Sequence, residues 1–500
     1  MMTKLAELKE SNTVLLRAAL TVALTIGSIL CYAQAEMSAF TATGKAGVAT
    51  TFITDYQSMG INPSNLGWKS KNEKMISLGL LEGGFSIYSE ALAKSELVQS
   101  FKTGNTEFTK AEKIAAAEEF TKTDLSMNFD LQWIALAVQP TEKSGGFAFG
   151  VKERFQWFSN FGETLSQILF LGHQAEYFTK LILNDGDTID NLANLPDTTI
   201  AKIVKGYCDL PQKFSDIIAD SRMSMAWYRE YNLSYGRRVV EADKFSLYAG
   251  IGLKYLTGLA LLDIRTTGGN LEAFSAITPA FGINYGDSVA DNNPSTIKSR
   301  GFLPKAVGKG FGLDIGISAI FFEKLKVGVA INDIGSITWD GNVYKAADDQ
   351  LVDMTSAGFA SYNIIKEAEG IMGDSGIFNW SGIQDKKLNL PTNIRLGASF
   401  MPNEKFEVGF DLVMPMNKVA GNYQKTLLAI GLDVIPVPWF KVSTGFAVGG
   451  NYGFNLPFGI LFSLGEGTWE VGVASRDIIT FFSQKSPTLS ASVGLLRFRF

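Results

Sequence analysis

The sequence is poor in the residues on which many soluble enzymes depend. It contains one histidine and two cysteines among 500 residues, and charged residues make up 19%, below the roughly 25% typical of soluble domains. The single histidine, His173, almost excludes histidine-based triads and histidine-rich zinc sites. Nucleophile-elbow, zinc-protease and phosphate-loop motifs are also missing. We therefore expect no enzymatic activity, no metal site and no cofactor.

Long apolar runs are lacking as well. No stretch reaches the roughly 20 residues that a membrane-spanning helix needs. The chain has instead 50 glycines and 36 phenylalanines, which suit a protein whose outer surface faces an apolar medium. Because lipid admits only helices and closed barrels, the composition favours a transmembrane β-barrel. The mild net charge of −5 indicates no nucleic-acid partner.

Residues 1–35 have the pattern of a secretory signal peptide. An apolar core from Ala18 to Leu30 precedes the small-residue pattern Ala33-Gln34-Ala35, which a signal peptidase recognises. The core is too short to cross a bilayer. Cleavage leaves Cys208 as the one cysteine, so the mature chain, beginning at Glu36, can form no internal disulfide. We expect export through the periplasm to the bacterial outer membrane.

Apolar side chains alternate with polar or small ones along residues 71–500, as transmembrane strands require. Phe406, Val408 and Phe410, for example, alternate with Glu407, Gly409 and Asp411. The same reading places every second residue from Leu125 to Ala137 on one apolar face. About fifteen segments fit this strand pattern. In this count 260–267 together with 272–284 is one candidate, separate from 245–258. Since bacterial single-chain barrels have even numbers, we predict an all-β antiparallel barrel of about 14 strands, with 16 as the alternative.

Alternation also assigns polar side chains to the barrel interior. Those expected in the lumen are Asp130, Asp314, Asn332, Arg395, Glu407, Asp411, Arg497 and Arg499, whereas Trp133, Phe400, Phe410 and Phe498 should face lipid. Asp314 and Asn332 fall on adjacent strands, and with Lys326 they could bind a polar ligand group or a cation. The alternative is that such charges pair with luminal arginines and lysines and pack the interior.

Three stretches interrupt the pattern at 91–122, 160–221 and 340–391. The first contains an Ala/Glu/Lys helix around Lys110 to Phe120. The second is expected to form two or three amphipathic helices, from apolar residues at Leu165, Ile168, Leu169, Phe178, Leu181 and Ile182. The third is mixed polar and helical. Such insertions usually become extracellular loops, and the alternative is that they plug the lumen.

Residues 36–70 lack a sustained apolar face. The stretch from Ala46 to Gly60 mixes glycine, threonine, aspartate and glutamine. Gly44 and Gly47 permit positive φ angles, and Pro63 cannot donate to a strand ladder. We therefore expect an N-terminal plug that is luminal or faces the periplasm, followed by the barrel over 71–500.

Five segments carry resemblances to known families. The segments Gly44-Lys45-Ala46-Gly47 and Asn62-Pro63-Ser64-Asn65-Leu66 resemble the opening of the FadL superfamily of outer-membrane porins and of the related PorV barrels of Bacteroidota, which more often have alanine at the third position of the second motif. Gly308–Gly316 and Ile331–Trp339 resemble an uncharacterised Bacteroidota barrel family known only as a domain of unknown function. The alternating end of the chain at Phe500 resembles the aromatic terminal strand that the barrel-assembly machinery recognises.

The resemblance implies a hatch. In FadL proteins the N-terminal segment folds into the lumen and substrates leave sideways through the wall, and the residues that match this opening are Gly44, Gly47, Asn62, Pro63 and Leu66. They form either a gate or a simple turn. The function that the resemblance implies is a passive channel for hydrophobic or amphipathic small molecules. The channel itself would be embedded in the outer-membrane lipid.

The alternative function is a non-transporting barrel subunit of a Bacteroidota secretion or surface-assembly complex, as in PorV. The channel hypothesis predicts an apolar pocket under the hatch and a break in the hydrogen bonding of the wall. The subunit hypothesis predicts an occluded lumen, a secretion-complex partner and a large exposed apolar patch on the insertions. The sequence does not decide between them.

Overall fold

The computed structural model describes residues 39–69, 74–91, 108–141, 143–297, 304–361, 367, 373, 376–483 and 487–500. Long antiparallel strands form a closed barrel of 14 strands, which confirms the predicted class and strand number. Around the wall these are β1 (Ile76–Tyr88), β2 (Leu125–Thr141), β3 (Gly145–Asn160), β7 (Arg222–Ala242), β8 (Phe245–Thr267), β10 (Gly308–Phe321), β11 (Leu325–Trp339), β16 (Asn393–Asn403), β17 (Phe406–Pro415), β18 (Leu427–Val437), β19 (Phe440–Gly449), β21 (Phe458–Leu464), β22 (Trp469–Ser475) and β23 (Thr488–Arg499). Pairing of β1 with β23 closes the circle.

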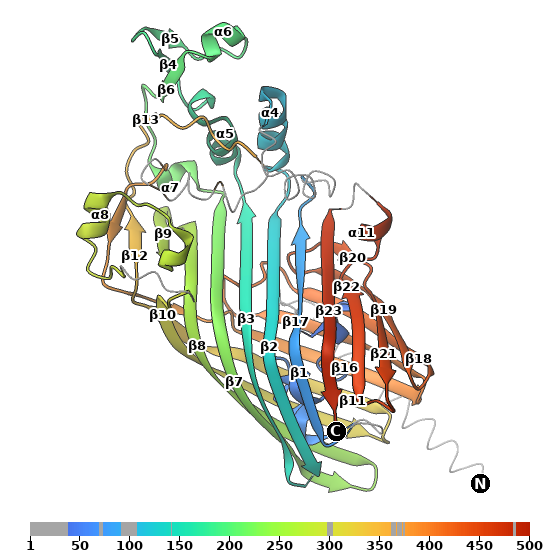
Figure 1. The fold of residues 1–500 in the computed structure, drawn as a ribbon. Coiled ribbons are helices and arrows are strands. Elements are labelled where there is room, and N and C mark those ends of the chain that lie inside the picture. Colours follow the sequence, from blue (N-terminus) through green and yellow to red (C-terminus); the bar gives the residue numbers. More distant parts are fainter. Residues whose placement is uncertain are drawn as a thin grey trace.

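The two ends of the barrel differ. Tight turns join neighbouring strands at the lower end in Figure 1, for example between β16 and β17 and between β18 and β19. The long connections, with most of the helices, lie at the upper end. We call these the lower and upper ends below. Among the described residues no helix is long and apolar enough to cross a membrane.

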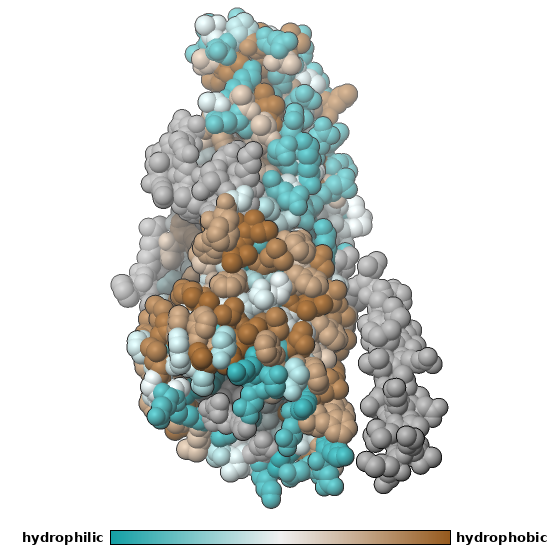
Figure 2. Space-filling view, turned by 90° about the vertical axis from the view of Figure 1, so that its right-hand side faces the viewer, coloured by the Kyte–Doolittle hydropathy of each residue, from teal (hydrophilic) through white to brown (hydrophobic). Residues whose placement is uncertain are grey.

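The outward side chains of the wall form an apolar belt. Figure 2 shows it as a band of hydrophobic surface with hydrophilic surface above and below. Trp133, Phe400 and Phe410 are 43%, 45% and 42% exposed on this face, while Phe498 is half-buried. Their neighbours along the strands point inward, because successive side chains of a strand point to opposite faces.

The predicted register of β2 is wrong beyond Trp133. A bulge between Gln132 and Ile134 shifts the pairing of β2 with β3. Ala135 and Ala137 consequently point inward and are buried, and Ile134 and Leu136 point outward. One extra residue in a strand reverses every later side chain, and no local sequence signal marked this bulge.

Structure above the barrel also differs from the sequence-based prediction. Residues 245–267 form the single strand β8, and β9 (Asn270–Ile277) extends the sheet above the wall. Leu181 and Ile182, predicted to be helical, lie in a strand. That strand belongs to a small separate sheet made of β4 (Lys180–Leu183), β5 (Thr188–Asp190), β6 (Ile203–Tyr207) and β13 (Asp353–Met354).

The remaining upper elements are short. The helices include α4 (Lys110–Glu119), α5 (Glu163–Leu171), η3 (Gly172–Gln174), α6 (Asp197–Ile200), α7 (Phe214–Ile217), η4 (Pro279–Phe281), α8 (Asp287–Asp291) and α11 (Ile479–Phe482). The described part of 340–391 contains short strands where we predicted mixed helix: β12 (Val343–Ala346), β14 (Trp380–Gly382) and β15 (Lys386–Asn389). A further strand, β20 (Phe454–Asn455), follows β19. The predicted signal peptide lies outside the described residues.

Residues 39–68, which we call the internal segment, lie inside the barrel and are buried throughout. They form α2 (Phe40–Thr43), η1 (Asp55–Ser58) and η2 (Pro63–Gly67). Glycines of the wall make room for them. The Phe40 ring covers Gly472 and Gly494, where a β-carbon would overlap the ring. Glycine on an inward strand position thus permits close approach of a second layer.

Replacement of Gly494 tests this packing. Gly494→Leu should push Phe40 off the wall and loosen the internal segment without altering the outward face, because position 494 is an inward position of β23. Limited proteolysis of the folded protein should then cut within residues 39–68. Ala491→Leu, at a half-buried position of the same strand, is the control and should leave the segment protected. Equal protection in both variants would contradict the packing described.

Candidate functional site

The internal segment is bound to the wall by polar contacts around its circumference. Lys45 Nζ donates to Asp433 Oδ2 at 2.6 Å. Asp411 Oδ2 accepts from the backbone N–H groups of Ala49 and Thr50, both at 2.9 Å, and from Thr50 Oγ1 at 2.7 Å. Arg395 reaches Asp411 at 3.6 Å. A buried carboxylate that accepts several N–H and O–H bonds can hold a backbone turn in one place.

The five residues matched to a hatch all lie in this segment. Asn62 begins η2: its Oδ1 accepts from the N–H of Ser64, and its Nδ2 donates to Ser318 Oγ on β10 at 2.9 Å. Pro63, at the first position of η2, lies against the backbone of β7 and β8 at Gly236 and Gly250. Asn62 therefore acts both as a helix cap and as an anchor to the wall.

The other three matched residues also face the wall. Gly44 lies against Gly459 of β21, and a β-carbon on either residue would come within 3.0 Å of the other's α-carbon, closer than ordinary contact. Gly47 has a φ of +81° and its carbonyl accepts from Arg395 Nη2 at 3.3 Å. Leu66 is buried, and its carbonyl accepts from Gln139 Nε2 at 3.1 Å.

Residues 55–57 bridge the seam between the first and last strands. Asp55 Oδ2 accepts from Arg497 at 2.7 Å and from Arg499 at 3.0 Å, both on β23. Gln57 Oε1 accepts from Arg497 at 3.1 Å, while its Nε2 donates to Glu82 of β1 at 3.2 Å. Because these contacts reach both strands, we call residues 55–57 the seam clamp.

Two further residues contribute to the contacts at the seam: Tyr56 of the seam clamp and Glu470 of the wall. Tyr56 Oη donates to Glu82 Oε1 at 2.5 Å. Glu470 of β22 lies 3.1 Å from Arg497 and 3.4 Å from Arg499. The two predicted luminal arginines are thus both placed in the interior, each between an acid of the wall and Asp55 of the internal segment.

The wall ladder is interrupted beside this clamp. Leu80 pairs with Leu496 and Gly83 with Val493, but Leu81 and Glu82 have no partner in the register of β23. Leu81 has a φ of +54° and points outward, which is unusual for a leucine. The strands on either side carry bulges at the same level, in β2 next to Trp133 and in the pairing of β22 with β23.

A cluster of six charged side chains lies inside the wall strands β3, β7, β8, β10 and β11. Lys254 Nζ is 2.6 Å from Asp333, 2.9 Å from Asp314 and 3.7 Å from Glu230. Arg154 reaches Asp333 at 3.0 Å and Glu230 at 3.3 Å, and Lys152 reaches Glu230 at 3.8 Å. Three cations therefore face three carboxylates, all of them buried.

This cluster corrects the predicted partners of Asp314. Lys326 does not join Asp314 and Asn332; its Nζ bonds Glu407 at 2.9 Å and lies 4.5 Å from the centre of the Trp68 ring. Asp333, which strict alternation places outward, points inward because its φ is +58° within a bulge between β10 and β11. Asn332 stays inward opposite Asn393.

Sequence reasoning missed several members of this interior. Arg154, Glu230 and Lys254 occupy inward positions of predicted strands, so the alternation contained the signal needed to find them. Asp130, which was predicted, is buried opposite Arg154 in the pairing of β2 with β3. The position of Asp55 had no such signal, because it lies outside any strand.

The upper mouth is crossed by the loop between β17 and β18, residues 416–426, which we call the crossing loop. The carbonyl of Lys418 accepts from Arg222 of β7 at 3.1 Å and from Arg265 of β8 at 2.7 Å. Arg222 also donates to Gln424 at 2.8 Å. In the strand order of the barrel β7 and β8 lie far from β17 and β18, so this loop spans the bore.

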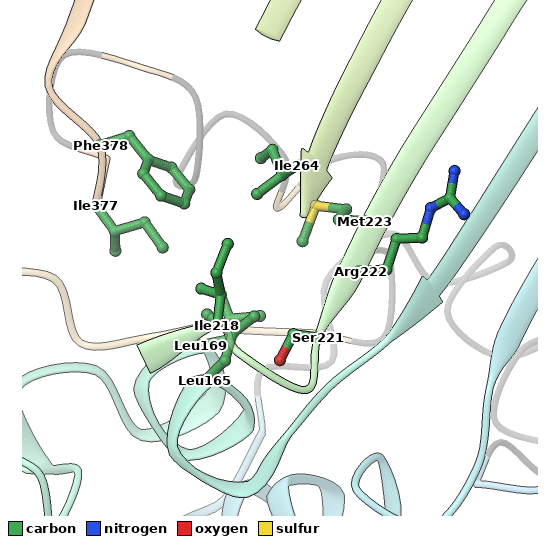
Figure 3. A pocket seen from close by; sticks show the side chains of 9 residues that line it. All are labelled: Leu165, Leu169, Ile218, Ser221, Arg222, Met223, Ile264, Ile377 and Phe378. Carbon is green, nitrogen blue, oxygen red and sulfur yellow. The ribbon is translucent and has the colours of Figure 1, made fainter. Parts of the chain in front are cut away.

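The apolar pocket in Figure 3 does not form a binding site. Leu165 and Leu169 of α5, Ile264 of β8, and Ile377 and Phe378 line it. Its volume of about 10 Å³ holds roughly one water molecule. His173, at the start of the neighbouring 3₁₀ turn, is buried, and burial lowers its pKa. Within the described ranges no three His, Cys, Asp or Glu side chains are arranged to hold a metal ion.

Loss of the seam clamp should weaken barrel closure. Asp55→Asn leaves Arg497 and Arg499 buried with fewer counter-charges, and breaking such a buried pair typically costs about 3–5 kcal/mol. We expect a lower temperature for the shift from compact to unfolded mobility on a gel. Lys180→Ala removes the exposed ion pair with Asp190, worth at most about 1 kcal/mol, and is the control. Equal thermal shifts would argue against the clamp.

Known proteins match the chain as follows. Three solved outer-membrane structures are similar to it: the Pseudomonas putida toluene transporter TodX (10% identity, TM-score 0.40, 94% of this chain and 98% of that chain), the Ralstonia pickettii toluene transporter TbuX (11%, 0.42, 94% and 99%) and a Pseudomonas aeruginosa FadL homologue (10%, 0.41, 94% and 96%). No curated protein sequence matches. The model of the family of unknown function DUF5723 matches residues 186–475. Since this match covers more than half of the chain and includes the motif at 308–339, the protein belongs to that family.

Proposed function

We propose that the protein is an outer-membrane channel for small hydrophobic or amphipathic molecules, closed at rest by the internal segment. The observation that carries the proposal is the way the bore is blocked. One continuous N-terminal segment fills it, and polar contacts such as Lys45 to Asp433 hold this segment in place. These contacts are polar, so water would replace them once the segment leaves the bore, although breaking each buried pair singly is costly.

The apolar belt supports the membrane location. On the face shown in Figure 2 it lies between two hydrophilic zones, as expected for a wall immersed in lipid. The tight turns lie together at the lower end and the long connections at the upper end. In outer-membrane barrels these ends face the periplasm and the exterior, respectively.

The interrupted ladder supports a sideways exit. Leu81 and Glu82 lack register partners on β23, and Glu82 is bonded to Tyr56 and Gln57 of the internal segment. Movement of the segment would therefore remove hydrogen-bond partners at a point where the wall ladder is interrupted. The outward side chains there, Leu81 and Trp133, are apolar and exposed, which suits passage of an apolar molecule into lipid.

A second candidate function is that of a barrel subunit in a secretion or surface-assembly complex. The occluded bore fits it, and exposed apolar side chains above the belt favour it: Leu210 is 84% exposed and Phe482 of α11 is 83% exposed. Leu192 and Phe481 are also exposed. Phe481 and Phe482 are adjacent in α11, and contiguous exposed apolar groups can mark protein contacts.

The membrane location predicts that a charge at an outward position of β17 impairs assembly whereas an apolar replacement there does not. Phe410→Arg places a charge on the lipid face, which costs about 2–4 kcal/mol near the bilayer centre. Phe410→Leu, which keeps the position apolar, is the matched control. We expect the arginine variant alone to accumulate poorly as folded, heat-resistant barrel in outer-membrane fractions. Normal assembly of both variants would show that this face does not contact lipid.

Removal of the internal segment tests the channel directly. Deleting residues 40–60 should raise uptake of an apolar fluorescent dye by cells, provided that the barrel remains heat-resistant on a gel. The double variant Lys45→Gln/Asp433→Asn, which removes one charged contact while keeping two polar side chains, should raise uptake less. Unchanged uptake by an intact deleted barrel, together with loss of a co-purifying protein, would favour the subunit function instead.

A further inference from the structure

The crossing loop encloses a small space in the upper lumen. A cavity of about 20 Å³ lies under Val419 and Ala420 of this loop and reaches Tyr228 of β7. Gly421 lies directly above Gln156 of β3, because a β-carbon on this glycine would be 2.7 Å from Gln156 Oε1. The loop therefore covers the cavity and the inner face of β3 and β7 together. We call this region the upper chamber.

One side of the upper chamber is apolar. Leu261 of β8, Ile337 and Trp339 of β11, and Leu390 line the cavity. All four side chains are buried. They form part of one cluster with Ala420 of the crossing loop, so an apolar group beneath the loop would be in contact with apolar atoms from several directions.

Three polar side chains in or beside the cavity lack partners among the described residues: Tyr228 lines it, Gln156 lies under Gly421 of the loop, and Asn128 is the register partner of Gln156. Asn128 and Gln156 are paired across β2 and β3, and both atoms of each amide group are buried without a hydrogen bond inside the described part of the chain. The Tyr228 hydroxyl is in the same situation. These three side chains are 2–3% exposed. Native proteins rarely leave buried polar groups unpaired, so something else in the lumen satisfies them.

The charge balance restricts what that partner can be. Beside Tyr228 lies the six-membered cluster around Lys254, in which Arg154 is 5.4 Å from the Tyr228 ring. Asp130, buried two residues from Asn128 on β2, has a partner of its own. The three cations and three carboxylates of the cluster compensate each other. A charged guest would thus meet no spare counter-charge in this cluster, whereas an uncharged group could bond the amides and the phenol.

We propose that the upper chamber binds a small amphipathic molecule whose polar group is uncharged and both donates and accepts hydrogen bonds, such as an amide or an alcohol. The apolar part would contact Leu261, Ile337 and Trp339, and the polar group would bond Asn128, Gln156 and Tyr228. Because the cavity is smaller than such a molecule, the crossing loop moves outward on binding. This inference names a substrate class for the proposed channel and so rests on the proposed function.

Three probes that share one ring test the chemistry. Benzamide, benzoate and toluene carry an uncharged hydrogen-bonding group, an anion and a methyl group, respectively. Their binding to the full chain in lipid nanodiscs is measured by equilibrium dialysis. We expect benzamide to bind at least about tenfold more tightly than benzoate or toluene, because two or more buried hydrogen bonds are gained.

Two variants locate the site. The double variant Asn128→Leu/Gln156→Leu should lose about tenfold or more in benzamide affinity while toluene binds as well as before or better. Asn270→Leu makes the same amide-to-leucine change at an exposed hairpin position and should change neither. Heat-resistant mobility on a gel confirms that each barrel is folded. If the double variant does not fold, Tyr228→Phe replaces it, with loss of benzamide affinity again expected.

Other results would overturn the inference. These are tightest binding of benzoate, equal binding of toluene and benzamide, binding that the lumen variants do not alter, or no binding of any probe, which would mean that water alone fills the chamber. The dye-uptake experiment separates this inference from the channel. A barrel that binds benzamide but stays closed after deletion of residues 40–60 fails the proposed function only, whereas one that opens but prefers toluene fails this inference only.

Discussion

Closure of the sheet between β1 and β23 is the constraint on which the rest of the structure depends. A barrel removes sheet edges only if its first and last strands pair, and here that pairing is incomplete at Leu81 and Glu82. The seam clamp compensates from inside, since Asp55 and Gln57 connect Arg497 to Glu82. The seam clamp thus both completes the wall and holds the internal segment in the bore.

The internal segment is held to the wall both by buried ion pairs, such as Lys45 with Asp433, and by apolar contacts, such as Phe40 against Gly472 and Gly494. Buried ion pairs gain little net stability over apolar residues of similar size, yet they are costly to break singly. Buried charged side chains of this kind therefore favour one arrangement strongly, because a slightly different arrangement would leave a charge unpaired. The interior also differs by region: Val48, Ala49 and Phe52 pack with Tyr423 and Tyr452 in an apolar cluster, whereas the Lys254 cluster occupies the β7, β8 and β10 side.

Much of the wall could be predicted from the sequence because alternation with a period of two is a local property. Asp411, Arg395 and Arg497 face inward where alternation puts them, and the strand number follows from the count of such segments. The prediction was wrong at Ala135 and Leu181, and strict alternation would also have placed Asp333 outward. Bulges and the choice between strand and helix for short apolar runs depend on neighbouring strands, which a local pattern does not contain.

The interior could be predicted only in part for a related reason. Alternation identifies which wall residues point inward, but it does not say which of them meet. Lys326 pairs with Glu407 and Lys254 takes the place beside Asp314 because the closed circle fixes distances between strands that are far apart in sequence. The crossing loop and the seam clamp lie outside strands and carried no periodic signal.

The seam clamp has a consequence for the order in which the protein acquires its structure. Asp55 and Arg497 are separated by 442 positions along the chain, so their contact joins two segments that are very distant in sequence. Contacts between such distant positions form late, because the loop between them must be ordered first. The internal segment therefore has no complete set of partners until the whole wall exists, and its locking in place marks the end of folding.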